Sequence, residues 1–482
     1  MGSGSLPFPE KRTRVGRRAG GRMAETTVRT TPDAMDAATL EATLDAALDA
    51  ARAGDSARVE ALLDPVHPAD VADLLEQVSD TDREALLAMG SAVIDGEVLS
   101  EISDAIREEV LDALPDDVVA DALRELDSDD LVDIVEDLEA EDQGRLLGAM
   151  DAADRVAVEQ ALAWPEQSAG RLMQRELVVA PEHWTVGEAI DFLRKAEHLP
   201  DQFYHVILVD PRMTPVGYVT LGRILSSGRD MALKAITEDS FRTVAATDEE
   251  ADVAYIFNQY HLISCPVVDG SGRLVGVITI DDAMNVLDEE HEEDMLRLAG
   301  VGDEADVSDG PLETVRQRLP WLVINLFTAS LSALVISQFQ NTIATLVALA
   351  ALMPIVASTG GIAGTQSLAV AVRALATRDL TRANAGRVVR RELLAGMMNG
   401  VSLALILGAA GVVIFGDWHL GAVLGLAMIV NQIVAALGGV LVPLTLERMG
   451  LDPALASGTF VTTLTDVMGF FAFLGLATVM LT

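Results

Sequence analysis

The sequence predicts a multidomain membrane protein, in which a superhelical α-helical N-domain and a repeated α/β module precede a polytopic α-helical transmembrane domain. Apolar residues are concentrated toward the C-terminus, in stretches long enough to cross a bilayer. A strand–turn–strand pattern occurs twice in the middle of the chain. The charge is divided unevenly, because residues 1–314 carry 25 Lys and Arg against 68 Asp and Glu, whereas the remainder carries nine Arg against six acids.

The acidity of the first part excludes some classes of partner. Lys and Arg surfaces bind nucleic acid, so we expect no nucleic acid partner. The excess of carboxylates favours solvation or cation binding. The single cysteine, Cys265, excludes an intrachain disulfide framework. Residues 1–36 contain a run of Arg and no apolar segment typical of a secretory signal, so we expect a disordered basic tail.

Residues 37–163 predict an acidic helical N-domain. Apolar residues recur at intervals of three and four, as in Val71, Leu74, Leu75 and Val78. Asp or Ser before each apolar run suits the capping of a helix start. Frequent turns interrupt the pattern, which indicates a stack of short helices rather than a bundle of long ones.

Residues 164–287 contain a repeat. The strands expected at 206–210 and 215–220 are matched 59 residues later by strands expected at 266–269 and 274–279. A helical pattern precedes each copy. A duplicated unit of this length indicates two α/β modules packed together.

Residues 315–482 predict a five-helix transmembrane domain. The second span contains Pro354 and a glycine-rich run, so we expect a broken or tilted helix. Gly360 and Gly364 are four residues apart, which indicates either close helix packing or backbone that faces a cavity. The expected spans are 320–340, 342–376, 393–415, 419–446 and 454–481.

The positions of Arg predict the orientation of these spans. Arg residues precede the first span, lie between the second and third, and lie between the fourth and fifth, whereas the other two connections have none. Short loops rich in Lys and Arg face the cytoplasm. We therefore expect a multi-pass protein of the cytoplasmic membrane with a cytoplasmic N-terminus and an external C-terminus.

Asp466 is the most informative residue, because it lies near the middle of the last apolar stretch. A carboxylate at membrane depth costs about 2.5–3.5 kcal/mol, so such groups usually line an ion path or a cavity. One interpretation is a cation site in a pore. The other is a packing carboxylate that is hydrogen-bonded to Thr462, Thr463 or Thr465.

Residues 288–314 predict an acidic linker helix between the repeated module and the first span. Residues 288–294 include six acids among seven residues. Such a run is commonly a solvated charged helix. Its place next to the membrane domain favours a gate that responds to divalent cations, because bound cations would cancel the repulsion between clustered carboxylates.

Several motifs, taken together, resemble a known family. The segment 266–282 is similar to a cystathionine-β-synthase (CBS) module, so the repeat resembles a tandem CBS pair. The segments 67–70, 168–173, 373–379 and 451–455 resemble motifs of MgtE-type magnesium channels in the same order. The resemblance extends over about 37–482.

The resemblance implies a homodimer in the lipid bilayer with a pore on its twofold axis. It implies that Asp466 binds Mg²⁺ in the pore and that Asp452 lies near the pore entrance. The remaining metal-binding acids that it implies are Glu290, Glu293 and Asp294 of the linker helix, Asp282 of the second CBS module, and Glu97, Asp129 and Asp133 of the N-domain. Ile362 and Thr365 replace Asn residues common in the family, and His261 and Asn285 replace acids found in some relatives.

The resemblance also indicates where a nucleotide would bind. Thr279 and Asp282 match the Thr-x-x-Asp pair with which CBS modules hold a ribose. The first module has Thr220 but Arg223 at the second position. ATP or another adenine nucleotide is therefore expected only at the second module.

These observations predict a magnesium-selective channel that mediates Mg²⁺ influx and is closed by cytosolic Mg²⁺. Mg²⁺ prefers six oxygen ligands and keeps much of its water, which suits sparse carboxylates in a pore. Two alternatives remain: a membrane-tethered, nucleotide-binding CBS sensor without conduction, and a transporter of Mn²⁺ or Co²⁺. An enzyme is not expected, because the sequence contains no nucleophile–base pair and no phosphate-binding loop.

Overall fold

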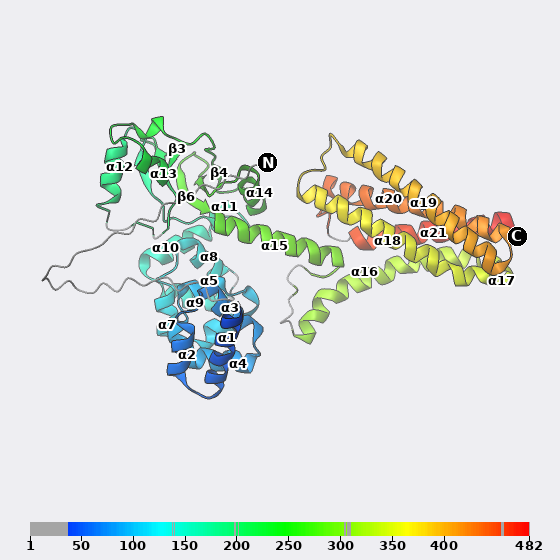
Figure 1. Ribbon diagram of the computed structural model, residues 1–482, viewed down its shortest axis with the longest axis horizontal. Helices are drawn as coiled ribbons and strands as arrows, with labels where there is room; N and C mark the ends of the chain where they lie inside the picture. Colours follow the sequence, from blue (N-terminus) through cyan, green and yellow to red (C-terminus); the bar gives the residue numbers. More distant parts are fainter. Residues whose placement is uncertain are drawn as a thin grey trace, which may run out of the picture. The chain divides into compact units, whose positions relative to one another are not determined.

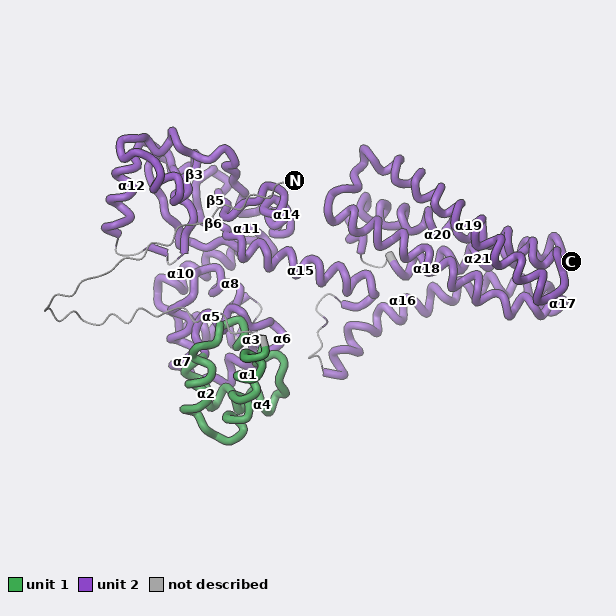
Figure 2. The backbone as a smooth tube through the Cα atoms, in the orientation of Figure 1, with its two compact units in different colours: residues 1–93 green, residues 94–482 purple. Residues whose placement is uncertain are grey.

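The computed structural model describes residues 37–481 apart from 137, 139, 197, 198, 201, 303, 304, 306–309, 455 and 456. The tail expected at 1–36 lies outside the described residues. The chain divides into two compact units, residues 1–93 and residues 94–482 (Figure 2).

The first unit is a stack of short helices. The apolar positions predicted from their spacing form its interior, since Val71, Leu74 and Leu75 are buried. Asp55 accepts a hydrogen bond from the backbone of Arg58 and thereby caps a helix start. The elements are α1 (Ala37–Arg52), α2 (Ser56–Leu63), α3 (Pro68–Gln77), α4 (Asp80–Gly90) and the 3₁₀ turn η1 (Ser91–Val93).

The second unit begins with further short helices. A buried guanidinium, that of Arg107, joins two of them by donating to the carbonyl of Ile102 at 3.1 Å and to Asp133 at 2.9 Å. The first six of these helices complete the acidic helical segment predicted at 37–163. The seventh lies within the segment predicted for the repeat. The seven helices are α5 (Gly96–Glu101), α6 (Asp104–Ala113), α7 (Asp116–Ala122), α8 (Ser128–Glu136), α9 (Ala140–Ala149), α10 (Ala152–Ala161) and α11 (Ala169–Leu172).

The predicted repeat forms two small sheets of the same design (Figure 1). In each sheet a parallel pair of strands is followed by an antiparallel pair. His205 Nδ1 and Ser264 Oγ, which occupy equivalent positions 59 residues apart, lie 2.6 Å from each other. The strands are β1 (Val179–Pro181), β2 (His205–Val209), β3 (Pro215–Thr220), β4 (Val244–Ala245), β5 (Ser264–Val268) and β6 (Leu274–Thr279), and the accompanying helices are α12 (Val186–Leu193), α13 (Leu221–Ser226), η2 (Leu233–Ala235) and α14 (Glu250–Tyr260).

The acidic linker belongs to a longer helix than expected. Helix α15 (Ile280–Ala299) begins immediately after β6, so the expected boundary at 287/288 falls inside it. The helix ends at Gly300, whose φ of 74° is the left-handed conformation typical of a helix C-terminus. A continuous helix therefore connects the second α/β module to the acids of the linker.

Five helices of the membrane half are long and apolar enough to cross a bilayer. The first extends from Pro311, earlier than the expected position 320, because the chain remains helical through Pro320. Pro354 and the glycines that follow do not break the second span, and the interruption lies at 346–347. Pro354 is exposed, and a proline removes only one hydrogen bond from the helix. The helices are α16 (Pro311–Gln338), the short α17 (Gln340–Thr345), α18 (Ala348–Ala376), α19 (Ala385–Phe415), α20 (Trp418–Arg448) and α21 (Ser457–Leu481).

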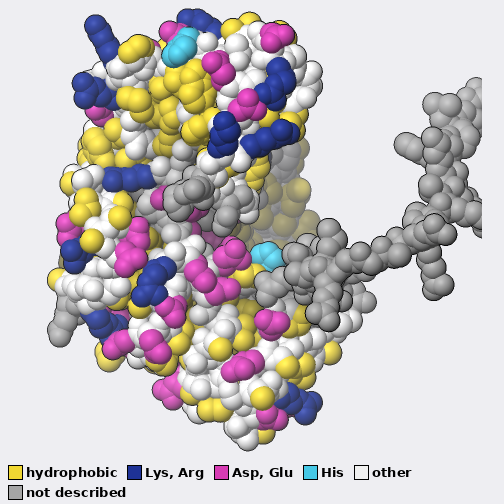
Figure 3. Space-filling view, turned by 90° about the vertical axis from the view of Figure 1, so that its left-hand side faces the viewer, with side chains coloured by type: hydrophobic (Ala, Val, Ile, Leu, Met, Phe, Trp, Pro, Cys, Tyr) yellow, Lys and Arg dark blue, Asp and Glu magenta, His cyan; other side chains and the backbone are white. Residues whose placement is uncertain are grey.

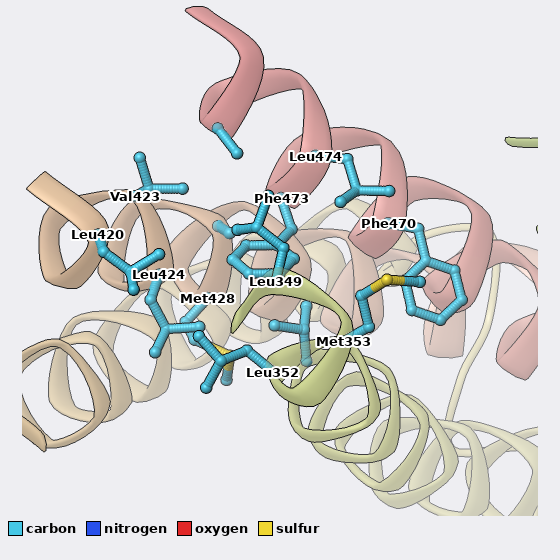
Figure 4. Packing of buried hydrophobic residues seen from close by; sticks show 13 residues of the cluster. Leu349, Leu352, Met353, Leu420, Val423, Leu424, Met428, Phe470, Phe473 and Leu474 are labelled. Atoms are coloured by element: carbon cyan, nitrogen blue, oxygen red, sulfur yellow. The ribbon is translucent and has the colours of Figure 1, made fainter. Parts of the chain in front are cut away.

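The core of the membrane half lies where α18, α20 and α21 meet (Figure 4). Met353 of α18, Met428 of α20 and Phe473 of α21 all belong to it, and Phe473 is fully buried. This packing fixes the faces that the three helices turn toward one another.

Figure 3 shows one face of the molecule, on which Lys and Arg are interspersed with Asp and Glu.

Candidate functional site

Asp466 lies on the face of α21 that turns into the bundle. Phe473 and Ala477, which follow it by about two and three helical turns, are fully buried. Asp466 itself is half-buried. The opposite face of α21 presents Phe460, Leu464 and Met468 to an apolar groove between α20 and α21.

No side chain that the structure describes forms a hydrogen bond or ion pair with Asp466. The three threonines proposed as its partners donate to backbone carbonyls of their own helix instead. Thr462 bonds to Gly458 at 2.9 Å and Thr463 to Thr459 at 2.7 Å. Thr465 bonds to the carbonyl of Thr462 at 2.8 Å. The alternative of a threonine-bonded packing carboxylate is therefore wrong.

The glycines of α18 allow neighbouring helices to approach closely. A Cβ at Gly364 would lie 2.6 Å from a methyl of Val461, and one at Gly360 would lie 2.1 Å from the amide of Asn431. Both glycines are buried. Close packing, rather than exposed backbone, is the role of this pair.

The sequence analysis missed two buried amides of α20. Asn431 is 0% exposed and donates to the carbonyl of Val356 on α18 at 2.8 Å. Its neighbour Gln432 donates to the carbonyl of Thr359 at 3.3 Å. Two amides in the middle of an otherwise apolar helix are the signal that could have identified them.

The acids of the linker helix gather around a guanidinium. Arg297 of α15 donates to Asp452 at 2.9 Å and to Glu293 at 2.8 Å. Burial, together with Glu293 and Asp294, raises the pKa of Glu290. Burial and the charge of Asp452 raise the pKa of Asp294. The structure thus brings together the three predicted linker acids and Asp452, and adds a cation that the sequence analysis did not assign.

A second group of acids lies where α8 meets the start of α15. Burial and the charge of Asp282 raise the pKa of Asp129 well above its usual range, and the same causes raise the pKa of Asp130 to about 7. Burial raises the pKa of Asp282 to about 6. Burial also raises the pKa of Asp133, although Arg107 opposes the shift. Asp130 is a further member that the sequence analysis missed.

Glu97 does not join this group. It lies exposed in the first turn of α5. No hydrogen bond or ion pair links its side chain to another residue that the structure describes.

Within the described ranges, no three His, Cys, Asp or Glu side chains are arranged to hold a metal ion together. The acid groups nevertheless suit a hard cation, because they offer oxygen ligands whose burial and mutual repulsion favour neutralisation. A hydrated Mg²⁺ needs only one or two direct carboxylates.

Thr279 and Asp282, the pair expected to hold a ribose, are hydrogen-bonded to each other in this structure. The Thr279 hydroxyl donates to Asp282 at 2.6 Å at the start of α15, as in a capping box. In the first module Arg223 pairs with Glu238 at 3.1 Å instead.

Family models match most of the N-domain, both α/β modules and most of the membrane half. A family model described as a divalent cation transporter, MgtE, matches residues 353–476. The model of the MgtE intracellular N domain matches 66–167, and the CBS domain model matches 169–230 and 233–289.

Two relatives extend over most of the chain. One from Thermus thermophilus, named magnesium transporter MgtE, is 32% identical over 439 residues, covering 89% of this chain and 96% of the relative. Another with the same name, from Enterococcus faecalis, is 34% identical and covers 66% of this chain and 70% of its own length. A solved cytosolic domain of the Mg²⁺ channel MgtE in complex with ATP is 29% identical, covers 50% of this chain and 99% of its own, and has a TM-score of 0.46.

Proposed function

This chain belongs to the MgtE family of divalent cation transporters, and from that premise we propose that it is a magnesium-selective channel for Mg²⁺ influx across the cytoplasmic membrane. The observation that carries the proposal is the unpaired carboxylate of Asp466 on the bundle-facing side of α21. An unpaired carboxylate at membrane depth calls for a compensating cation.

The proposed conduction site uses two copies of the chain. A homodimer with α21 near its twofold axis would bring two Asp466 carboxylates to one conduit, and their charge would match one Mg²⁺. Because Mg²⁺ sheds water reluctantly, we propose that the two carboxylates hold it through its hydration shell. The dimer, the conduit, the cytoplasmic N-terminus and the external C-terminus are parts of this proposal.

The proposed gate is the acidic set on α8, α15 and the connection between α20 and α21. Cytosolic Mg²⁺ would neutralise the crowded carboxylates near Asp282 and Asp452 and hold these elements together in the closed state. Moving a gate from 1:99 to 99:1 requires about 5.5 kcal/mol. A closed-state site at tenfold over its Kd supplies about 1.4 kcal/mol, so about four such sites suffice.

Uptake by reconstituted liposomes tests the conduction site. We expect Asp466→Asn to lower the initial rate of Mg²⁺ entry to roughly a tenth of wild type or less, because a neutral side chain no longer attracts the dication. Asp417→Asn is the matched control, since Asp417 caps the start of α20 outside the spans. Normal uptake by Asp466→Asn would overturn the proposal.

The same liposomes distinguish the two alternatives. A CBS sensor without conduction would move no ion in the wild-type protein. A Mn²⁺ or Co²⁺ transporter would take up those ions at a concentration at which Mg²⁺, supplied alone, enters only negligibly. We expect Mg²⁺ entry that the other two ions compete with only weakly.

We also propose that ATP or another adenine nucleotide binds at the second CBS module, where Thr279 and Asp282 are retained. Binding would exchange their mutual hydrogen bond for contacts with the ribose. We expect ATP to raise the unfolding temperature of the wild-type protein but not of Asp282→Asn. Equal stabilisation of both would remove this site from the proposal.

A further inference from the structure

The amide of Asn431 occupies a narrow space between two glycines on different helices. A Cβ on Gly360 of α18 would lie 2.9 Å from Asn431 Oδ1, and a Cβ on Gly469 of α21 would lie 3.0 Å from it. The side chain is 0% exposed. The absence of both Cβ atoms is what allows a carboxamide to fit here.

The orientation of this amide is determined by its other end. Nδ2 donates to the carbonyl of Val356 at 2.8 Å. Rotating the amide by half a turn would place Oδ1 against the carbonyl oxygen of Val356. The oxygen therefore faces away from Val356, and within the described part of the chain this buried Oδ1 has no hydrogen-bond donor.

A second oxygen group that no described residue supplies with a donor is the Asp466 carboxylate, one helical turn from Gly469. Gly469 follows Asp466 by three residues on α21, so their Cβ positions are about 5–6 Å apart. The Asp466 carboxylate, like Asn431 Oδ1, has no hydrogen-bonded partner among the described residues. Two acceptors without a donor among the described residues fit a cation or its water ligands, because an acceptor is satisfied only by positive charge or by an N–H or O–H group.

We propose that Asn431 Oδ1 is a second, neutral oxygen of the cation site at Asp466, and that it binds a water ligand of the hydrated divalent cation. The inference rests on the proposed function, whose conduction site it extends. The carboxylate supplies the charge, and the amide oxygen orients the hydration shell from the side of α20.

Gln432 provides a matched comparison. It is 2% exposed and also donates to a carbonyl of α18, that of Thr359. The backbone of Gln432 lies against Gly396 of α19, and its Cβ lies against Gly400 of the same helix. Loss of Gln432 therefore removes a similar helix–helix hydrogen bond at a residue that does not contact Gly360 or Gly469 at their Cβ positions.

The test measures the half-saturating Mg²⁺ concentration and the maximal uptake rate separately in liposomes. We expect Asn431→Leu, which conserves volume and removes the oxygen, to raise the half-saturating concentration at least tenfold. We expect Asn431→Asp, which keeps an oxygen and adds charge, to lower it below the wild-type value. Gln432→Leu is expected to stay within about threefold of wild type.

If the half-saturating concentration rises in Asn431→Leu and falls in Asn431→Asp, the oxygen belongs to the ion site and does not act through packing alone. The proposal is overturned if Asn431→Leu and Gln432→Leu raise the half-saturating concentration equally, or if both change only the maximal rate. If Asn431→Leu does not elute as a folded protein from a size-exclusion column, Asn431→Asp alone is the test. An unchanged half-saturating concentration in Asn431→Asp then overturns the proposal. Normal uptake by Asp466→Asn would remove the proposed function itself, whereas loss of uptake in Asp466→Asn together with unchanged half-saturating concentrations in the Asn431 variants would remove only this inference.

Discussion

At the scale of single residues, Arg297 is the group that most changes the interpretation of the linker helix. The sequence predicted that the acids of this run bind divalent cations, and a guanidinium from the same helix pairs with Asp452 and Glu293. The chain thus supplies one positive charge of its own to this group of acids.

Arg297→Gln is expected to make closure require more Mg²⁺. Its side chain and that of Asp452 are 22% and 29% exposed, so the pair is worth about 1 kcal/mol, which corresponds to roughly a fivefold higher half-closing Mg²⁺ concentration. The measurement is Mg²⁺ flux against internal Mg²⁺. Arg145→Gln, which breaks a more exposed pair with Asp112, is the control. A half-closing concentration equal to wild type would show that Arg297 has no part in closure.

Gly364→Ala is expected to lower the thermal stability of the protein in detergent. The added methyl would lie 2.6 Å from Val461, and overpacking of this kind typically costs about 1–3 kcal/mol. Gly475→Ala on α21 is the control, because nothing lies within 4 Å of the added carbon. Equal unfolding temperatures for the two variants would contradict the close packing of α18 against α21.

At the scale of elements, the meeting of α8 with the start of α15 is a proton-sensitive contact. Unfolded Asp titrates near 4, whereas the pKa of Asp282 is raised to about 6 and that of Asp130 to about 7. The folded chain therefore binds more protons than the unfolded chain between about pH 4 and pH 7. Stability is highest below this window and falls as pH rises through it.

We accordingly expect the unfolding temperature of the full chain, without Mg²⁺, to fall between about pH 5.5 and pH 8. Added Mg²⁺ should restore it more at the higher pH, where protons no longer compete for the carboxylates. Asp130→Asn should make the unfolding temperature depend less on pH. A stability that rises with pH in wild type would contradict the assigned burial of these acids.

At the scale of the whole molecule, a basic residue makes one of the contacts between the second α/β module and the membrane half. Arg378, in the connection after α18, pairs with Asp252 of α14 and lies 4.2 Å from the ring centre of Tyr255. Because α18 carries Gly364, which packs against Val461 of α21, we propose this contact as a route from the α/β module to the proposed pore.

Arg378→Ala is therefore expected to weaken closure by internal Mg²⁺ while leaving uptake at low internal Mg²⁺ intact. Flux at high internal Mg²⁺ should rise severalfold above that of wild type. Arg382→Ala, an exposed residue of the same connection, is the control. Closure unchanged in Arg378→Ala would exclude this route.

The sequence by itself determined the class of the protein. Apolar stretches, the charge division and the repeated strands are local properties, so they predicted the five spans, the helical N-domain and the paired α/β modules. Asp466 could be singled out for the same reason, because an acid in an apolar run is visible without a structure. The boundary expected at 287/288 lies inside α15, which is continuous from Ile280 to Ala299.

Only the tertiary structure decided which distant groups meet. Arg297 and Asp452 are 155 residues apart, and neither residue's neighbours in sequence indicate the other. Asn431 was passed over because its meaning depends on two glycines of other helices, Gly360 and Gly469, whose missing Cβ atoms make room for it. Local periodicity determines which elements form, but contacts across the bundle depend on how helix faces pack, and no short stretch of sequence encodes that packing.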